Sequence, residues 1–194
     1  MLSNPCRKVI WKTLPRREKD SSTNYLVNSA SMIHLRKLEP SDLPYLYQWE
    51  NDAAVWTDSD THNPLSKQDL RNYIESSTGD IYRDGQLRLL IEDTGDKSTL
   101  GCVDLFDFDP RNRKAAIGLY IAPAMRGRGI GKEAMKQMER YAFKVLNLRL
   151  MYAVIRSSNK VCLALYRSLG YKQTALLPQW TLEGDAYVLT KYNN

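Results

Sequence analysis

The sequence predicts a domain of the α+β class. An apolar run, Ala115–Ile121, leads through a glycine-rich turn into a long helical pattern. Leu150–Ile155 is apolar on both alternations, which is typical of a central strand covered on both faces. The chain has 194 residues, 43% hydrophobic and 26% charged, which suffices for one domain with a substantial core.

Periodic apolar positions and turn residues divide the chain into short elements. Pro40 opens the first predicted helix, with Asp42 in its first turn, where the helix dipole favours an acidic side chain. Ser66 and Asp69 resemble a capping box at the start of the second helix. The elements predicted in chain order are a strand at 33–38, helices at 40–51 and 66–76, strands at 88–92, 99–108 and 114–121, a helix from 130 to about 147, a strand at 150–155, a helix at 159–169, and closing strands at 171–174 and 187–190.

Turns and helix faces support the later elements. Turns at 94–96 and 109–112 separate the three middle strands. Gly170 takes the position that follows a helix C-terminus. The helix from 130 has one apolar face, formed by Ile130, Ala134, Met138, Tyr141, Ala142 and Val145. Its polar residues are expected mostly on the opposite face: Lys132, Glu133, Lys136, Gln137 and Arg140.

The formal charge of +6 belongs mainly to the N-terminal end of the chain. Of 28 basic and 22 acidic residues, six basic and two acidic ones precede Met32, which leaves 22 and 20 for the rest. A nearly neutral domain has no broad basic face, so we expect no binding of nucleic acid. We expect residues 1–31 to be a flexible basic extension, residues 32–194 to be the functional domain, and Met32 to be the native start.

Other common site types find no support in the sequence. No apolar run has the length of a membrane span, and the N-terminus lacks the apolar region of a secretory signal. The three cysteines, Cys6, Cys102 and Cys162, are too scattered for a disulfide framework or a metal site. His34 and His62, the two histidines, indicate neither a Ser-His-Asp triad nor a metal cluster. We therefore expect a cytoplasmic protein that needs no metal and binds no membrane.

The most informative motif is Arg126-Gly127-Arg128-Gly129-Ile130-Gly131, between a strand and a helix. Glycines allow a close approach of backbone to a ligand, and the first N–H groups of a helix attract anions, so the motif predicts a phosphate or pyrophosphate site. A Walker loop would need glycine at Arg126 and a hydroxyl residue at Glu133, and the dinucleotide fingerprint needs another glycine spacing. An ordinary solvated turn is the alternative that the motif alone leaves open.

A second motif lies about 30 residues downstream, Asn159-x-x-Cys162-x-x-Leu165-Tyr166-x-x-x-Gly170-Tyr171. Together the two motifs resemble the signatures of the GNAT superfamily of N-acetyltransferases, Gln/Arg-x-x-Gly-x-Gly/Ala and Asn-x-x-Ala-x-x-Leu-Tyr-x-x-x-Gly-Phe. The resemblance covers roughly residues 33–191. It is greatest for the subgroup of diamine and spermidine acetyltransferases and ribosomal-protein N-terminal acetyltransferases, whose opening resembles residues 35–43 and 49–52.

This resemblance implies a fold, a co-substrate and roles for individual residues. The GNAT fold is α/β/α-like: a mixed twisted sheet of about six to seven strands, flanked by helices, with splayed central strands. Acetyl-CoA would be the co-substrate, with its pantetheine arm between residues 119–121 and 150–155, and Tyr166 would be the general acid that protonates the leaving thiolate. Simple packing is the competing interpretation of Tyr166. The expected cofactor-binding residues are Leu119, Ile121, Arg126, Gly127, Arg128, Gly129, Ile130, Gly131 and Asn159.

The acceptor is expected to be a small cationic amine such as a polyamine. Glu50 and Asp52 are the expected substrate-binding residues, and Asp58 and Asp60 follow in the same acidic segment. The subgroup often has a glutamate where this chain has Ala116, so the base that deprotonates the amine stays unassigned. The candidates for the base are Glu50, Asp52, Asp104 and Tyr120. Trp49, Trp56 and Trp180 are candidates for pocket walls or for packing.

Alternative functions also follow from these observations. The acceptor amine could instead be a protein N-terminus or an aminoglycoside. A non-catalytic acyl-CoA-binding module of the same fold would carry the same motifs, and a nucleic-acid-binding protein would use the basic extension. Dimers are common in the family, so the resemblance implies a possible homodimer, although no sequence feature marks an interface.

Overall fold

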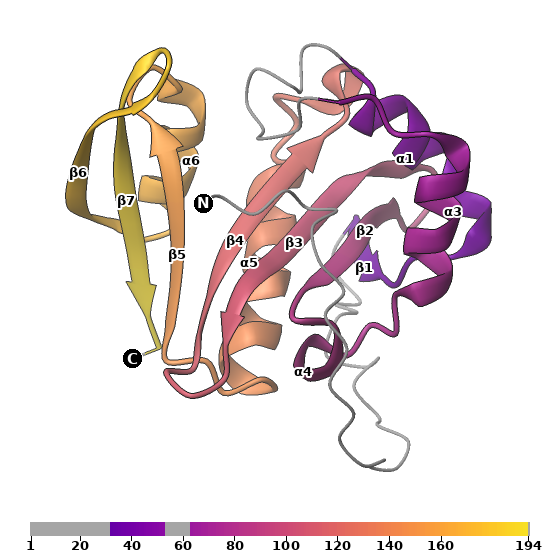
Figure 1. The fold of residues 1–194 in the computed structure, drawn as a ribbon, viewed down its shortest axis with the longest axis horizontal. Coiled ribbons are helices and arrows are strands. Elements are labelled where there is room, and N and C mark those ends of the chain that lie inside the picture. The colour runs from indigo at the N-terminus through magenta and orange to yellow at the C-terminus, as the bar shows by residue number, and fades with distance from the viewer. Residues whose placement is uncertain (1–31, 53–62, 194) are drawn as a thin grey trace.

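The computed structural model describes residues 32–52 and 63–193. Seven strands form one sheet in the order β1-β2-β3-β4-β5-β7-β6 (Figure 1). This confirms the predicted mixed sheet. The strands are β1 (Ile33–Arg36), β2 (Leu87–Asp93), β3 (Thr99–Asp109), β4 (Lys114–Ile121), β5 (Leu150–Arg156), β6 (Lys172–Thr181) and β7 (Gly184–Tyr192).

The centre of the sheet is splayed, as predicted. β4 and β5 are its one parallel pair, and their register comprises three residue pairs, from Lys114 with Leu150 to Ala116 with Tyr152. Beyond these pairs the two strands diverge toward their C-terminal ends, as Figure 1 shows at its top. We call the diverging stretches, residues 117–121 of β4 and 153–156 of β5, the fork.

Helices cover both faces of the sheet and create two apolar cores. On one face α1 and α3 pack Leu46, Trp49 and Leu70 against Leu90 and Cys102 of the sheet. On the other face α5 and α6 close a larger core over strands β1 to β5 and β7. The helices are α1 (Leu43–Glu50), which follows a 3-10 turn at Pro40–Asp42, α3 (Lys67–Ser76), α4 (Ile81–Asp84), α5 (Ile130–Lys144) and α6 (Lys160–Ser168).

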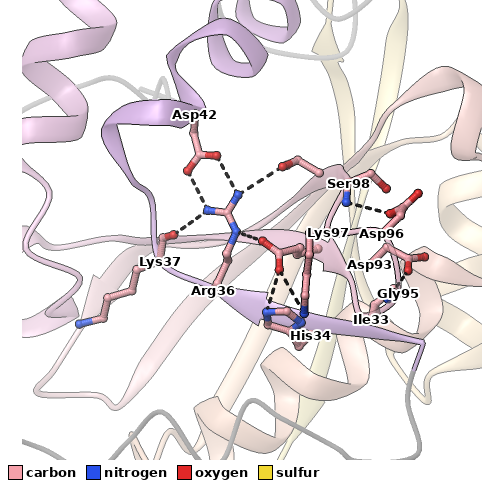
Figure 2. A network of polar contacts seen from close by, with 12 residues as sticks. Ile33, His34, Arg36, Lys37, Asp42, Asp93, Gly95, Asp96, Lys97 and Ser98 are labelled. Carbon is pink, nitrogen blue, oxygen red and sulfur yellow. Dashed lines mark hydrogen bonds and ion pairs between the residues drawn. The ribbon is translucent and has the colours of Figure 1, made fainter.

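A network around Arg36 fixes the start of α1 on the sheet (Figure 2). The Arg36 guanidinium donates two hydrogen bonds of 2.8 Å to the buried Asp42 carboxylate, and it also contacts Glu92 on β2. Asp42 additionally accepts a hydrogen bond from the backbone N–H of Glu39 at 2.8 Å. A buried carboxylate is stable when it is paired and hydrogen-bonded, so this network holds α1 at a defined position relative to β1.

The predicted faces of α5 are right for the apolar residues at its centre and wrong for Gln137. Ala134, Met138 and Ala142 are fully buried, as their spacing predicts. Gln137 is also fully buried, because its side-chain amide donates a 3.0 Å hydrogen bond to the Ile33 carbonyl of β1. A buried polar group needs such a partner, and this one lies 104 residues away in the chain.

Most predicted boundaries agree with the structure within a few residues. The capping box at Ser66 is confirmed, since its side chain accepts from the Asp69 N–H and Asp69 accepts from the Ser66 N–H. The closing hairpin is longer than predicted, because β6 lies mostly exposed and lacks apolar alternation. The short α4 was not predicted. The division at residue 31 falls outside the described residues.

Candidate active site

The glycine-rich loop connects the open end of β4 to α5. A 3-10 turn, Pro123–Met125, follows β4, and Gly129 caps α5 with a φ of 77°. This left-handed conformation is one that residues with side chains rarely adopt. The Glu133 N–H makes the first intrahelical hydrogen bond, 3.2 Å to the Gly129 carbonyl. The backbone N–H groups before it therefore have the arrangement that binds anions at helix N-termini.

Gly131 allows the first turn of α5 to pack closely against β4. A Cβ atom at Gly131 would lie 2.9 Å from Cδ2 of Leu119 and 3.5 Å from Cγ1 of Ile121. Leu119 and Ile121 direct these side chains into the larger core, while their backbones belong to the fork. The sequence motif thus places the loop, the helix start and the open edge of β4 side by side.

The two loop arginines have different surroundings. Arg126 Nε donates a 3.0 Å hydrogen bond to the carbonyl of Ile121, the last residue of β4. Arg128 lines a hollow of about 440 Å³ together with Ile33, Asp93 and Gly129. No residue of β5 or α6 lines this hollow, which therefore lies apart from the fork.

The second motif forms the start and the inner face of α6. Asn159 caps this helix, and its side-chain oxygen accepts a 3.0 Å hydrogen bond from the Cys162 N–H. Tyr166 is 2% exposed, and its hydroxyl donates a 2.8 Å hydrogen bond to the Ile117 carbonyl of β4. Since Ile117 is the first residue beyond the paired part of β4, the phenol lies at the closed end of the fork.

The environment of Tyr166 favours its protonated form. Burial is the main cause that raises the pKa of Tyr166 well above its ordinary value, and negative charge at Cys162, Glu139 and Asp104 adds to the effect. A phenol with a raised pKa holds its proton at neutral pH. It therefore has the protonation state that a general acid requires.

The expected acceptor side contains a buried ion cluster. Arg88 of β2 donates a 2.5 Å hydrogen bond to Glu50 of α1, and bonds of 2.9 and 2.8 Å to the two carboxylate oxygens of Asp104 on β3. Burial opposes the charge of Arg88, but Asp104, followed by Cys102, Tyr73 and Glu50, outweighs burial and raises the pKa of Arg88 well above its ordinary value. Two of the four candidate bases are thus bound to one arginine, which the sequence reasoning missed.

Aromatic and acidic groups surround the outer part of β4 on the same face. The ring of Tyr120 lies 5.2 Å from that of Trp49, measured between centroids. Burial and then the negative charge of Asp52 raise the pKa of Tyr120. Asp104 lies opposite Gly118 in the strand register, two residues along β4 from Ala116. A carboxylate therefore lies one strand away from the position where the subgroup often has a glutamate.

The remaining candidates do not join this cluster or cannot be placed. Trp180 is 45% exposed on β6, in the closing hairpin. Trp56, Asp58, Asp60 and His62 lie outside the described residues. Within residues 32–52 and 63–193, no group of three or more His, Cys, Asp or Glu side chains is arranged to hold a metal ion. None of the helices in these ranges is long and apolar enough to cross a membrane.

Comparison with known proteins identifies the family. The model of the acetyltransferase (GNAT) domain matches residues 33–172. The chain belongs to the GNAT family of acetyltransferases. It is an acetyl-CoA-dependent N-acetyltransferase, as the paired motifs implied.

The proteins to which this chain is similar include spermidine acetyltransferases. The spermidine N(1)-acetyltransferase of Escherichia coli strain K12 is 30% identical over 161 residues, which cover 81% of this chain and 82% of that enzyme. A crystal structure of the Vibrio cholerae spermidine N-acetyltransferase in complex with CoA and spermine has a TM-score of 0.74 at 22% identity, covering 84% of this chain and 96% of that chain. A dodecameric structure of the Vibrio cholerae enzyme has a TM-score of 0.71 at 21% identity and covers 84% of this chain and 94% of that chain. At these identities the two structures establish the fold.

Proposed function

We propose that this GNAT enzyme transfers the acetyl group of acetyl-CoA to a primary amine of a polyamine. The observation that carries the proposal is the fork, with the Gly129–Gly131 helix start beyond its open end and the Tyr166 phenol at its closed end. Along β4, an anion site, an unpaired strand edge and a proton donor therefore follow one another.

The chain's own groups fit the parts of acetyl-CoA. Backbone N–H groups of the loop and the charges of Arg126 and Arg128 would hold the pyrophosphate. The unpaired backbone of Leu119 and Ile121 would pair with the amide arm, as an added strand does, and a backbone N–H near these residues would polarise the thioester carbonyl. The side-chain amide of Asn159 would support the same arm near the start of α6.

Tyr166 is proposed as the general acid. Amine attack on the thioester forms the new C–N bond and breaks the C–S bond, the sulfur leaves as a thiolate, and the amine nitrogen gives up one proton to a carboxylate or to water. Tyr166 would give its proton to this sulfur after exchanging its present hydrogen bond to Ile117. Protonation by a positioned group contributes about 10²- to 10⁴-fold in rate.

The polyamine assignment rests on the acidic face and on the similarity to spermidine acetyltransferases. Arg88, Glu50 and Asp104 together carry one net negative charge, and Asp52 lies near Tyr120 on the same side. We propose Asp52 and Glu50 as the groups that attract the ammonium form of the acceptor. A homodimer is a separate proposal, which sedimentation velocity tests directly.

The test combines product analysis with one conservative variant. Mass spectrometry of mixtures with acetyl-CoA and spermidine, spermine, a peptide N-terminus or an aminoglycoside should detect an acetylated polyamine. Tyr166→Phe should lower kcat by about 10²-fold while acetyl-CoA binding is retained. Tyr192→Phe, at a half-exposed tyrosine of β7, is the matched control. Acetylation of the peptide or the aminoglycoside alone would refute the polyamine assignment, and an unchanged Tyr166→Phe would refute the acid.

A further inference from the structure

A buried ionic pair joins α5 to β7 near Tyr166. Glu139 of α5 is 6% exposed, and its Oε2 atom accepts a 2.6 Å hydrogen bond from Nζ of Lys191 on β7. Burial raises the pKa of Glu139, and the Lys191 ammonium opposes that change. A buried carboxylate of this kind is costly unless it is paired, so the pair calls for an explanation beyond surface charge.

Tyr171 lies between this pair and Tyr166. The rings of Tyr166 and Tyr171 meet edge to face, with centroids 5.0 Å apart and planes at 69°. Lys191 Nζ lies 5.6 Å from the centroid of the Tyr171 ring. The Tyr171 hydroxyl and the second oxygen of Glu139 are both buried, and burial together with the Glu139 carboxylate, which the Tyr171 hydroxyl closely faces, raises the pKa of Tyr171. Tyr171 therefore packs directly against Tyr166, and Glu139 and Lys191 lie beside Tyr171.

We propose that Glu139, Lys191 and Tyr171 act as positioning residues, which hold the Tyr166 phenol at the fork and tune how firmly it keeps its proton. This inference rests on the proposed acid role of Tyr166. Glu139 lies on α5, Tyr171 follows α6 and Lys191 lies on β7, so residues from three parts of the chain meet around Tyr171, which packs against Tyr166.

The signs of the neighbouring charges make the inference specific. The titratable groups that act on Tyr166 are Cys162 on its own helix, Glu139 on α5 and Asp104 on β3, and Asp104 is bound to Arg88. Lys191 and Tyr171 complete the set on the remaining side. Negative charge at Glu139 opposes ionisation of the phenol, whereas positive charge at Lys191 favours it.

Removal of the Glu139 charge and removal of the Lys191 charge should therefore shift the pKa of residue 166 in opposite directions. A difluorinated tyrosine incorporated at position 166 brings the phenol into an accessible pH range, and its ¹⁹F NMR signal reports the titration without turnover. Glu139→Gln should lower this pKa, and Lys191→Met should raise it, each by about 1 pH unit. The double variant Glu139→Gln/Lys191→Met should have a pKa at residue 166 near that of the protein without these two substitutions.

Controls separate tuning from general damage. Glu75→Gln removes an exposed carboxylate from α3, on the opposite face of the sheet, and should leave the titration unchanged. Tyr171→Phe retains the aromatic edge and should keep kcat, whereas Tyr171→Leu should lower kcat about tenfold at an unchanged KM for acetyl-CoA. If Lys191→Met does not fold, Lys191→Gln takes its place.

The outcomes divide cleanly. Opposite shifts of the ¹⁹F titration support the inference, even in a protein that acetylates none of the offered amines, which would count against the proposed function alone. Shifts in the same direction, or shifts below about 0.3 pH unit in both variants, would overturn the inference while acetyl transfer stands. Equal kcat values for Tyr171→Leu and Tyr171→Phe would overturn the positioning part.

Discussion

Arg88→Met should cause a large loss of stability, because Arg88 joins α1 to two strands. Its side chain is 6% exposed, and those of its partners Glu50 and Asp104 are 11% and 18% exposed. The substitution removes the bonds of 2.5, 2.8 and 2.9 Å and leaves two carboxylates without their cation. Loss of one partner from a buried ionic group costs about 3–5 kcal/mol.

For a domain of this size, such a change lowers the melting temperature by about 10 °C. Thermal unfolding followed by circular dichroism, with urea titration as a second measurement, checks the value. Arg71→Met on the exposed face of α3 is the matched control and should change stability by less than about 0.5 kcal/mol. Adding Glu50→Gln and Asp104→Asn to Arg88→Met should recover much of the loss, since no unpaired charge remains. A loss below about 1 kcal/mol for Arg88→Met alone would refute the reasoning.

Three further variants test local features. Gly131→Ala places a Cβ 2.9 Å from Leu119, so unfolding assays should show a loss of about 1–3 kcal/mol, and calorimetry should show weaker acetyl-CoA binding. Ser66→Ala removes the helix cap and should cost about 1 kcal/mol in urea titration. Burial raises the pKa of Cys162 to about 11, so in a Cys6→Ser background its labelling by a thiol reagent should be slow at pH 8 and accelerate toward pH 11.

Local patterns were sufficient to predict most of the framework and the loop. β4 begins and ends where its apolar run predicts, and the glycine motif lies at the start of α5. These features depend on neighbouring residues, because backbone propensity and side-chain period act over a few positions. Asn159 and Tyr166 are identified through the resemblance to the second GNAT signature, whose positions lie at the start and within one helix.

Long-range pairing explains what the sequence did not reveal. The sequence predicts Glu50 as an acceptor-binding residue but does not reveal its partner Arg88, which lies 38 residues away in the chain. One signal was present, since an arginine between Leu87 and Leu89 in a buried strand requires a counter-charge. Gln137 was misplaced for a similar reason, because its partner is a backbone carbonyl of β1.

The divergence of β4 and β5 gives the middle of this sheet two internal edges. Backbone groups at an edge strand are available to pair with any extended chain, a property that most proteins restrict to the rim and protect. Here the unpaired edges face each other in the middle of the sheet, between β4 and β5. Solvent should therefore exchange the amide hydrogens of residues 117–121 that point toward β5 faster than their central location suggests, until a bound arm completes the ladder.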